Sequence, residues 1–261
     1  MPEALSPAHA PWHGLRRVAL PLLLLALFEL VARRAVALGS EVLAPPSAAL
    51  QAMWGAALDG SLWSATAFTL GSVALGLFIG GGLGTLAGLH LGLFPRAARA
   101  SFLSVELLRS LPTVALLPLF MLVFGFGLPL QVCLVAAGSF WPPLILVQGA
   151  VRQVDPQLLD LARLLQLSGA ARLTKVVLPA TVPRLVTALR LGLAFSLQIA
   201  VTVEIAGNPH GMGYAMLLAE QTLAPALMIG WLGWIGLIGL LFNTALLRLQ
   251  RALERRWGGG A

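Results

Sequence analysis

The stretch GLFIGGGLGTLAGLHLG, residues 76–92, carries a glycine at every fourth position: Gly76, Gly80, Gly84, Gly88 and Gly92. Positions four apart lie on one face of an α-helix, so these glycines form a stripe without side chains. Such a stripe lets a second helix approach the backbone closely, as is typical of helices packed in membranes. We predict that Gly76, Gly80, Gly84 and Gly88 are helix-packing residues.

The composition around this stretch is that of a membrane protein. The chain has 261 residues, of which 58% are hydrophobic and only 10% are charged, and its mean hydropathy is +0.89. Residues 60–95, 110–151 and 221–247 contain no Asp, Glu, Lys or Arg. About 20 apolar residues cross about 30 Å of hydrocarbon. Each uncharged run is therefore long enough to span a bilayer, and 110–151 is long enough to do so twice.

These patterns predict an all-α, polytopic membrane protein with about six transmembrane helices. The turn-forming glycines and proline at 125–129 separate the third span from the fourth. The expected spans are 18–38, 64–92, 101–124, 130–150, 188–207 and 227–247.

Lysine and arginine are distributed unevenly between the two sides that these spans define. One side receives fourteen of the seventeen, and the other receives only Arg33 and Arg34. Because basic residues collect on the cytoplasmic side of a bilayer, both termini are expected in the cytoplasm. The predicted organisation is a cytoplasmic tail over 1–17, one transmembrane domain over 18–250 with a cytoplasmic loop over 152–187, and a second cytoplasmic tail over 251–261.

The same rule accounts for the net charge of +7, so we expect no nucleic-acid partner. The four histidines are scattered and the single cysteine, Cys133, lies in an apolar run, so no metal site or disulfide is predicted. No Ser-His-Asp or paired-carboxylate arrangement can be assembled from the sequence, which argues against an enzyme.

Residues 160–185, DLARLLQLSGAARLTKVVLPATVPRL, are unusually charged for this chain. Asp155 and Pro156 favour a helix start, and the leucines that follow give the helix one apolar face. We expect Gly169 to break this helix, and a second short helix over 170–177 to stop before Pro179. The pattern fits either a helix lying at the membrane surface or a docking element for a cytoplasmic partner.

This segment resembles the signature loop of permease subunits of binding-protein-dependent ABC importers. Asp160 matches the acidic position of that loop, Ala162 and Arg163 follow it, and KVVLPATVP (175–183) matches its distal end. Four further stretches are similar to the sulfonate, taurine and nitrate branch of the family, and the resemblance covers about residues 40–250. These stretches are LAPPSAAL (43–50), LRSLPTVALLPLFMLVFGFG (108–127), VRQVDPQLLDLAR (151–163) and VEIAGNPHGMGY (203–214).

One position departs from the family pattern. Gln166, thirteen residues before Pro179, stands where the family usually has glycine, and Gly169 comes three residues later. Either the bend has moved to Gly169 or the docking geometry differs, because glycine permits a tight bend there. The resemblance implies that the segment couples to the ATPase through Asp160, Ala162, Arg163, Gln166, Gly169, Arg172 and Pro179.

The resemblance also implies a function and a set of partners. The chain would be the transmembrane permease of an importer for a small solute, most closely an anion such as a sulfonate, taurine or nitrate. Cytoplasmic ATPase subunits, an extracytoplasmic solute-binding protein, a second permease copy and the lipid of the cell inner membrane would be its partners. Lys175, the only lysine, follows Thr174 rather than glycine, so there is no phosphate loop and the partner would bind ATP. No cofactor is expected on this chain.

Ionisable residues inside spans are candidates for the translocation pathway, since burying them in a membrane is costly. Glu204 is a candidate gate or pathway residue, or a structural carboxylate at a helix end. Gln198 and Thr202 share a face of the helix with Glu204 to within a turn, and we expect them to line the same pathway. Arg109 can pair with Glu106 one turn earlier, or it can contact an anionic substrate.

A self-sufficient secondary transporter or channel is the alternative hypothesis. Such a protein would concentrate charged residues in the middle of its spans for ion coupling. Here the large loop region over 152–190 holds eight charged residues instead. A membrane-embedded enzyme would need clustered His, Asp or Glu, which the sequence lacks.

Overall fold

The structure, a computed structural model, describes residues 12–257, and within them every regular element is helical. The predicted all-α fold is confirmed. The elements before the middle of the chain are α1 (Trp12–Ala37), α2 (Pro46–Leu58), α3 (Ser61–Leu93), α4 (Pro95–Ser110), the 3-10 helix η1 (Thr113–Leu116) and α5 (Leu117–Phe124). Those after it are α6 (Leu128–Ser139), α7 (Trp141–Arg152), α8 (Pro156–Leu164), α9 (Gly169–Arg172), the π-helical turn η2 (Leu173–Val177), α10 (Leu178–Ala206), α11 (Met212–Gln221) and α12 (Pro225–Trp257).

Four helical segments are long and apolar enough to cross a membrane: Ser61–Leu93, Leu128–Arg152, Gly169–Ala206 and Pro225–Ala252. The pair formed by α4 with η1 and α5 makes a fifth if it counts as one broken span. The first of the six expected spans forms α1, a helix that carries Glu29, Arg33 and Arg34 and does not belong to this set. Of the predicted tails, residues 1–11 and 258–261 lie outside the described residues, whereas 12–17 and 251–257 extend α1 and α12.

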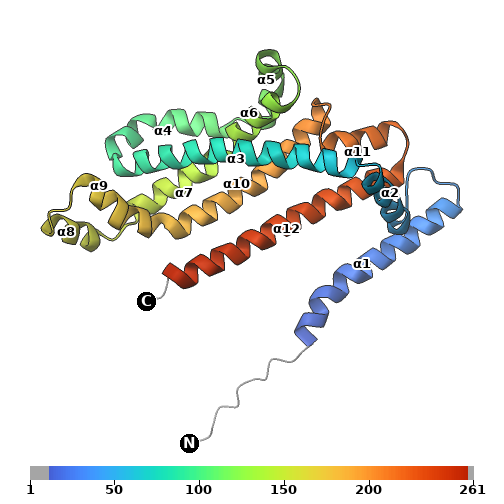
Figure 1. The fold of residues 1–261 in the computed structure, drawn as a ribbon, viewed down its shortest axis with the longest axis horizontal. Coiled ribbons are helices and arrows are strands. Elements are labelled where there is room, and N and C mark those ends of the chain that lie inside the picture. The colour runs from blue at the N-terminus through green and yellow to red at the C-terminus, as the bar shows by residue number, and fades with distance from the viewer. Residues whose placement is uncertain (1–11, 258–261) are drawn as a thin grey trace, which may run out of the picture.

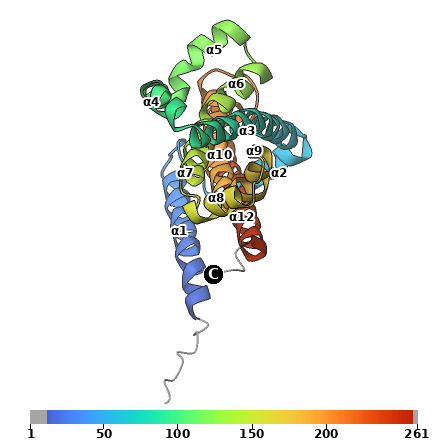
Figure 2. The ribbon, with the colours of Figure 1, turned by 90° about the vertical axis from the view of Figure 1, so that its left-hand side faces the viewer.

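The long helix α3 forms the axis of the molecule (Figure 1). Its 33 residues span about 50 Å at 1.5 Å per residue. The segments α8 and α9 lie at one end of this axis, and α2 and α11 lie at the other. Figure 2, which looks along the axis from the α8 end, shows α4 and α5 on one side of α3 and both α1 and α12 on the opposite side.

The glycine stripe of α3 faces the helix formed by α6 and α7. A Cβ added to Gly80 would overlap the carbonyl oxygen of Ala136, and one added to Gly84 would overlap that of Phe140. The same helix lies against Gly76, Gly88 and Gly92. Gly82, on another face of α3, has open space around it. Two backbones are therefore in direct contact over four turns, and this contact fixes α3 against α6 and α7.

The third expected span, 101–124, is interrupted rather than continuous. The helix α4 ends at Ser110, and η1 and α5 follow after a bend of 82°. Pro112 explains the break, because proline has no amide hydrogen and forces the preceding residue, Leu111, into an extended conformation. The bend turns α5 away from the bundle axis (Figure 1).

Two helices at the α2 end were not predicted from the sequence. The helix α2 lies between the first two expected spans, and α11 follows the fifth expected span. Glu29 of α1 holds the start of α2, because its carboxylate accepts hydrogen bonds from the amide and hydroxyl of Ser47 at 3.0 and 2.7 Å. Arg33 pairs with the same carboxylate at 2.5 Å.

Candidate functional site

The segment between α7 and α10 begins with a capped helix. Asp155 accepts a hydrogen bond from the amide of Gln157 at 2.8 Å, and Pro156 is the first residue of α8. The predicted helix start is confirmed. An aspartate at this position satisfies an amide that has no partner inside the helix, and proline has no amide to satisfy.

The helix α8 presents both apolar and charged side chains to solvent. Asp160 and Arg163 form an ion pair at 2.6 Å, with 64% of each side chain exposed. Ala162 between them is buried, with 2% of its surface exposed. The exposed apolar side chains are Leu158, Leu161, Leu164 and Leu165. A surface of leucines beside a charge pair at the tip of the molecule is chemically suited to binding another protein (Figure 1).

The bend after α8 lies at Gln166, not at Gly169. Gln166 has a left-handed backbone with φ of 50°, a conformation that favours glycine. Its amide donates to the carbonyl of Arg163 at 2.9 Å, and the amide of Leu167 donates to that of Ala162 at 3.0 Å. These two bonds make the Schellman motif that closes many helices. Gln166 therefore occupies the glycine position of the bend, and the expected break at Gly169 is corrected.

The second helix of this segment does not stop before Pro179 as expected. Gly169 is the first residue of α9, which Ser168 caps through the amide of Ala171 at 3.2 Å. The helix then continues without interruption to Ala206. The π-helical turn over 173–177 explains how, because its wider hydrogen-bond spacing leads into α10, where Pro179 stands at the helix start.

A buried polar cluster lies at the opposite end of the bundle, where α3, α6, α10 and α11 meet. Glu204 of α10 has no exposed surface. Its Oε1 accepts from the hydroxyl of Thr69 at 2.7 Å and from the Nε2 amide of Gln131 at 2.5 Å, and its Oε2 accepts from the amide of Gly213 at 2.8 Å. None of these three donors is charged. Full hydrogen bonding is what a buried carboxylate requires.

The cluster extends to the loop after α10 and to the turn before α6. Asn208 donates from Nδ2 to Oε1 of Gln131 at 2.5 Å, and its Oδ1 accepts from the amide of Gly127 at 2.8 Å. The Thr69 hydroxyl also accepts from the amide of Met212 at 2.9 Å. One continuous chain of hydrogen bonds thus fixes four segments that are far apart in sequence.

Gly211 makes room for the Glu204 carboxylate. Its φ is +95°, and a Cβ there would overlap both the carboxyl carbon and Oε1 of Glu204. A side chain at this position would be strained by the backbone and blocked by the carboxylate. The glycine is therefore part of the same cluster.

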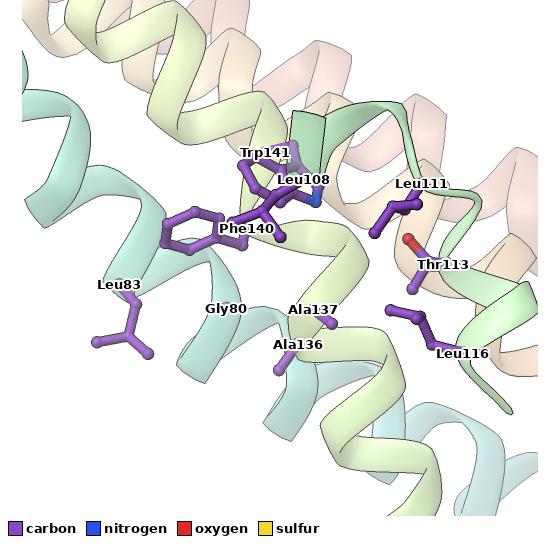
Figure 3. A pocket seen from close by; sticks show the side chains of 10 residues that line it. All are labelled: Gly80, Leu83, Leu108, Leu111, Thr113, Leu116, Ala136, Ala137, Phe140 and Trp141. Atoms are coloured by element: carbon purple, nitrogen blue, oxygen red, sulfur yellow. The ribbon is translucent and has the colours of Figure 1, made fainter. Parts of the chain in front are cut away.

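The bend between α4 and η1 forms the wall of two cavities. The smaller, about 290 Å³, lies between this segment and the α3–α6 contact. Figure 3 shows Leu111, Thr113 and Leu116 on one side and Ala136 and Ala137 of α6 facing them. The larger, about 480 Å³, shares Leu111, Thr113 and Trp141 with it and adds residues of α7 and α10.

Arg109 lines the larger cavity and pairs with Glu106 of the same helix. The predicted pairing one turn apart is therefore present. About half of each side chain is exposed, so the pair is open to solvent or to a ligand.

Comparison with known proteins places these features in a family. Residues 80–259, more than half of the chain, match the model of the family described as "Binding-protein-dependent transport system inner membrane component". The chain belongs to this family. It is therefore the permease subunit of an ABC importer, and the sequence-based identification is confirmed.

The permease is similar to three curated proteins at 29% identity. A putative aliphatic sulfonates transport permease of Bacillus subtilis aligns over 82% of this chain and 78% of its own length. A protein with the same description from Escherichia coli K12 aligns over 95% and 91%, and the taurine transport system permease of the same organism over 75% and 71%. These relatives belong to the branch that the sequence motifs indicated.

The fold of the permease is also found in a solved structure, that of the MetNI methionine ABC transporter in inward-facing conformations. A chain of that transporter superimposes with a TM-score of 0.61 at 22% identity, and the match covers 73% of this chain and 93% of that chain. The likeness concerns the helical architecture.

The residues predicted to form the pathway do not gather in one place. Glu204 lies in the buried cluster, whereas Arg109 lines the cavity at the bend. Gln198 is exposed, and the Thr202 hydroxyl donates to its carbonyl at 2.8 Å. Among the described residues, neither Gln198 nor Thr202 bonds to the Glu204 carboxylate. All the predicted coupling residues, by contrast, lie in or next to the α8–α9 segment.

Sequence reasoning missed Thr69, Gln131 and Asn208, which surround Glu204. Thr69 and Gln131 lie within uncharged apolar runs, and Asn208 directly follows the fifth expected span. Polar residues in spans usually hydrogen-bond across helices, so the positions of Thr69 and Gln131 were a usable signal. The sequence alone could not show that these three separate stretches contribute to one cluster.

Proposed function

We propose that this permease imports a small organic anion of the sulfonate type, using ATP that cytoplasmic partner subunits hydrolyse. Support for the substrate class comes from its similarity to permeases named for aliphatic sulfonates and taurine. The family description supports a binding protein as the source of substrate. In this proposal the binding protein delivers the anion on the extracytoplasmic side, and the permease carries it across the bilayer.

The observation that carries the proposal is the α8–α9 segment. An exposed helix with leucines and an ion pair at the tip of the molecule is suited to a groove on a soluble subunit. We propose that α8 and α9 transmit closure of the ATPases to α10, with which α9 is continuous through η2.

The orientation follows from charge. Most lysine and arginine residues lie on the side of the predicted spans that also contains the α8–α9 segment. The distribution of basic residues supports placing this end, together with both termini, in the cytoplasm. The Glu204 cluster and α11 then lie on the extracytoplasmic side of the cell inner membrane, where the binding protein would dock.

A second copy of the permease completes the proposed pathway. The side of the bundle around α10 and the α4–η1 bend leaves large apolar side chains exposed, Leu111, Leu191 and Phe195 among them. Facing copies would enclose a passage between them, and lipid would cover the outer helices. ATP binding is assigned to the partner subunits, because the sequence has no phosphate loop.

Reconstitution tests this proposal directly. The permease is co-expressed with the ATPase and binding protein encoded beside it, purified as a complex and placed in lipid vesicles. Uptake of radiolabelled taurine and of a labelled alkanesulfonate is then measured. We expect uptake of at least one of them only when ATP, ATPase and binding protein are all present. Uptake by the permease alone, driven by an ion gradient, would instead establish a self-sufficient transporter.

A further inference from the structure

The cavity at the α4–η1 bend combines one cation with an otherwise largely apolar wall. Its volume is about 480 Å³. Arg109 is its only charged lining residue, and Thr113 supplies a hydroxyl. Most of the remaining lining is apolar, with Trp141, Ile145 and Phe195 as its largest side chains.

The cavity lies near the middle of the spans. Gly138 and Trp141 stand midway along the segment Leu128–Arg152, and Phe195 stands near the middle of α10 (Leu178–Ala206). With a hydrocarbon core about 30 Å thick, residues at these positions fall close to the bilayer midplane. Substrate sites of membrane transporters are commonly found at this depth.

The guanidinium of Arg109 has donors available. Glu106 bonds to Nη2, and no bond from Nε or Nη1 is found among the described residues. The side chain is 43% exposed. A guanidinium group can bind two oxygens of one carboxylate or phosphate group through two parallel hydrogen bonds, and a sulfonate also offers such a pair of oxygens.

Two other hollows of the permease lack this combination. The hollow lined by α1, α2, α3 and α12, about 580 Å³, has no charged lining residue. The hollow beside Arg99 and Arg152, about 240 Å³, lies at the α8 end of the bundle, beyond the middle of the spans.

We propose that the permeating anion occupies the Arg109 cavity, with its sulfonate oxygens on the guanidinium and its carbon chain against Trp141, Ile145 and Phe195. This inference rests on the proposed function and narrows its substrate class. An anion with an apolar tail satisfies both parts of the wall. A zwitterion would place an ammonium group among apolar side chains at a desolvation cost, and an inorganic anion would leave the apolar wall unused.

Charge-selective labelling tests the cavity without relying on the selectivity of the binding protein. Cys133, the only cysteine, is replaced by serine, and Thr113→Cys places a thiol in the cavity wall. The permease–ATPase complex is treated with the anionic reagent 2-sulfonatoethyl methanethiosulfonate, itself an ethanesulfonate, or with its cationic trimethylammonium counterpart. Mass spectrometry of this chain gives both labelling rates, and Leu146→Cys provides a second reporter position.

We expect Arg109→Gln to lower the ratio of anionic to cationic labelling about tenfold. Arg109→Lys retains most of the preference, and Arg99→Gln, which removes an exposed arginine from the same helix, leaves the ratio unchanged. We also expect 1-pentanesulfonate to slow labelling, and nitrate and 1-pentanol at the same concentration not to do so.

Three results would overturn the proposal: equal ratios with and without Arg109, protection by nitrate as strong as that by pentanesulfonate, or no labelling at either reporter. ATP-dependent uptake by the same reconstituted complex separates the two levels of inference. If uptake persists while the labelling fails, the cavity assignment is wrong and the proposed function stands. If uptake is absent in the unsubstituted complex, the proposed function itself fails.

Discussion

At the α11 end of the bundle, Glu204 is buried and both of its oxygens are bonded within the chain, whereas at the α8 end Asp160 and Arg163 bond to each other and stand mostly in solvent. Leaving a buried carboxylate unpartnered costs several kcal/mol, so the hydrogen bonds of the Glu204 cluster are needed for the stability of this end of the bundle. An exposed pair contributes only about 0–1 kcal/mol. The comparison separates charge that builds the architecture from charge that is available to a partner.

The close contact between α3 and α6, which lies between the two ends of the bundle, should be the most sensitive to substitution. In Gly80→Ala the new methyl group overlaps the carbonyl oxygen of Ala136, and a backbone atom of a packed helix cannot turn away. We expect a loss of about 4 kcal/mol or more in stability, so that little folded protein accumulates. Thermal unfolding of the purified protein in detergent measures it.

Gly82→Ala is the matched control, because Gly82 lies on the same helix with open space around it. This change should alter stability by no more than about 1 kcal/mol, in the stabilising direction that helix propensity favours. Equal effects at the two positions would contradict the close helix contact.

Disrupting the polar cluster should have the next largest effect. Glu204→Leu leaves the Gln131 amide and the Gly213 N–H buried without an acceptor. We expect a loss of about 3 kcal/mol in unfolding free energy, since each unsatisfied buried group costs about 1–3 kcal/mol. Hydrogen exchange at α11 should also rise, because the cluster holds the start of that helix.

Glu220→Gln provides the control for removing a carboxylate, because Glu220 is exposed. It should leave both stability and exchange unchanged. A Glu204→Leu protein as stable as the unsubstituted one, with α11 equally protected, would show that the cluster does not hold this end together.

A smaller and opposite effect is expected at the bend after α8. Gln166→Gly relieves a left-handed backbone that costs a side-chain-bearing residue about 1 kcal/mol, so α8 should become better protected in hydrogen exchange. Gln166→Ala removes the polar group without relieving the backbone and should bring no such gain. If Gln166→Ala protected α8 from exchange as strongly as Gln166→Gly does, the gain would come from removing the glutamine side chain and not from relieving the backbone.

Local features of the fold were predictable from the sequence because they depend on short-range patterns. The uncharged runs located the helical spans, and Asp155 with Pro156 located the start of α8. The 82° bend at Pro112 was not predicted, although proline was visible, because it lies inside an apolar run that also fits one span. The short helices α2 and α11 lack a pattern long enough to distinguish them from loops.

The candidate sites divide in the same way. The coupling segment is contiguous in sequence, so its residues were found together. The partners of Glu204 come from α3, α6 and α11, and only the folded packing brings them together. The bend at Gln166 was assigned to Gly169 because composition favours glycine, whereas the helix hydrogen bonds fix the position. Sequence patterns report spacing along one element and not contacts between elements.

The least effect on stability, and the sharpest test of the comparison, is expected at α8. Asp160→Ala with Arg163→Ala removes an exposed pair and should change the unfolding free energy by less than about 1 kcal/mol. We nevertheless expect co-purification with the ATPase to fall at least tenfold, because charges on a docking surface set its orientation. Arg34→Ala with Glu41→Ala removes one positive and one negative charge from exposed positions near the other end and should leave ATPase binding intact.

If both double variants bind the ATPase normally, the α8 pair is not part of the contact, and the exposed leucines of α8 become the surface to test. If the α8 variant instead loses stability as Glu204→Leu does, the division between architectural and partner-facing charge is wrong.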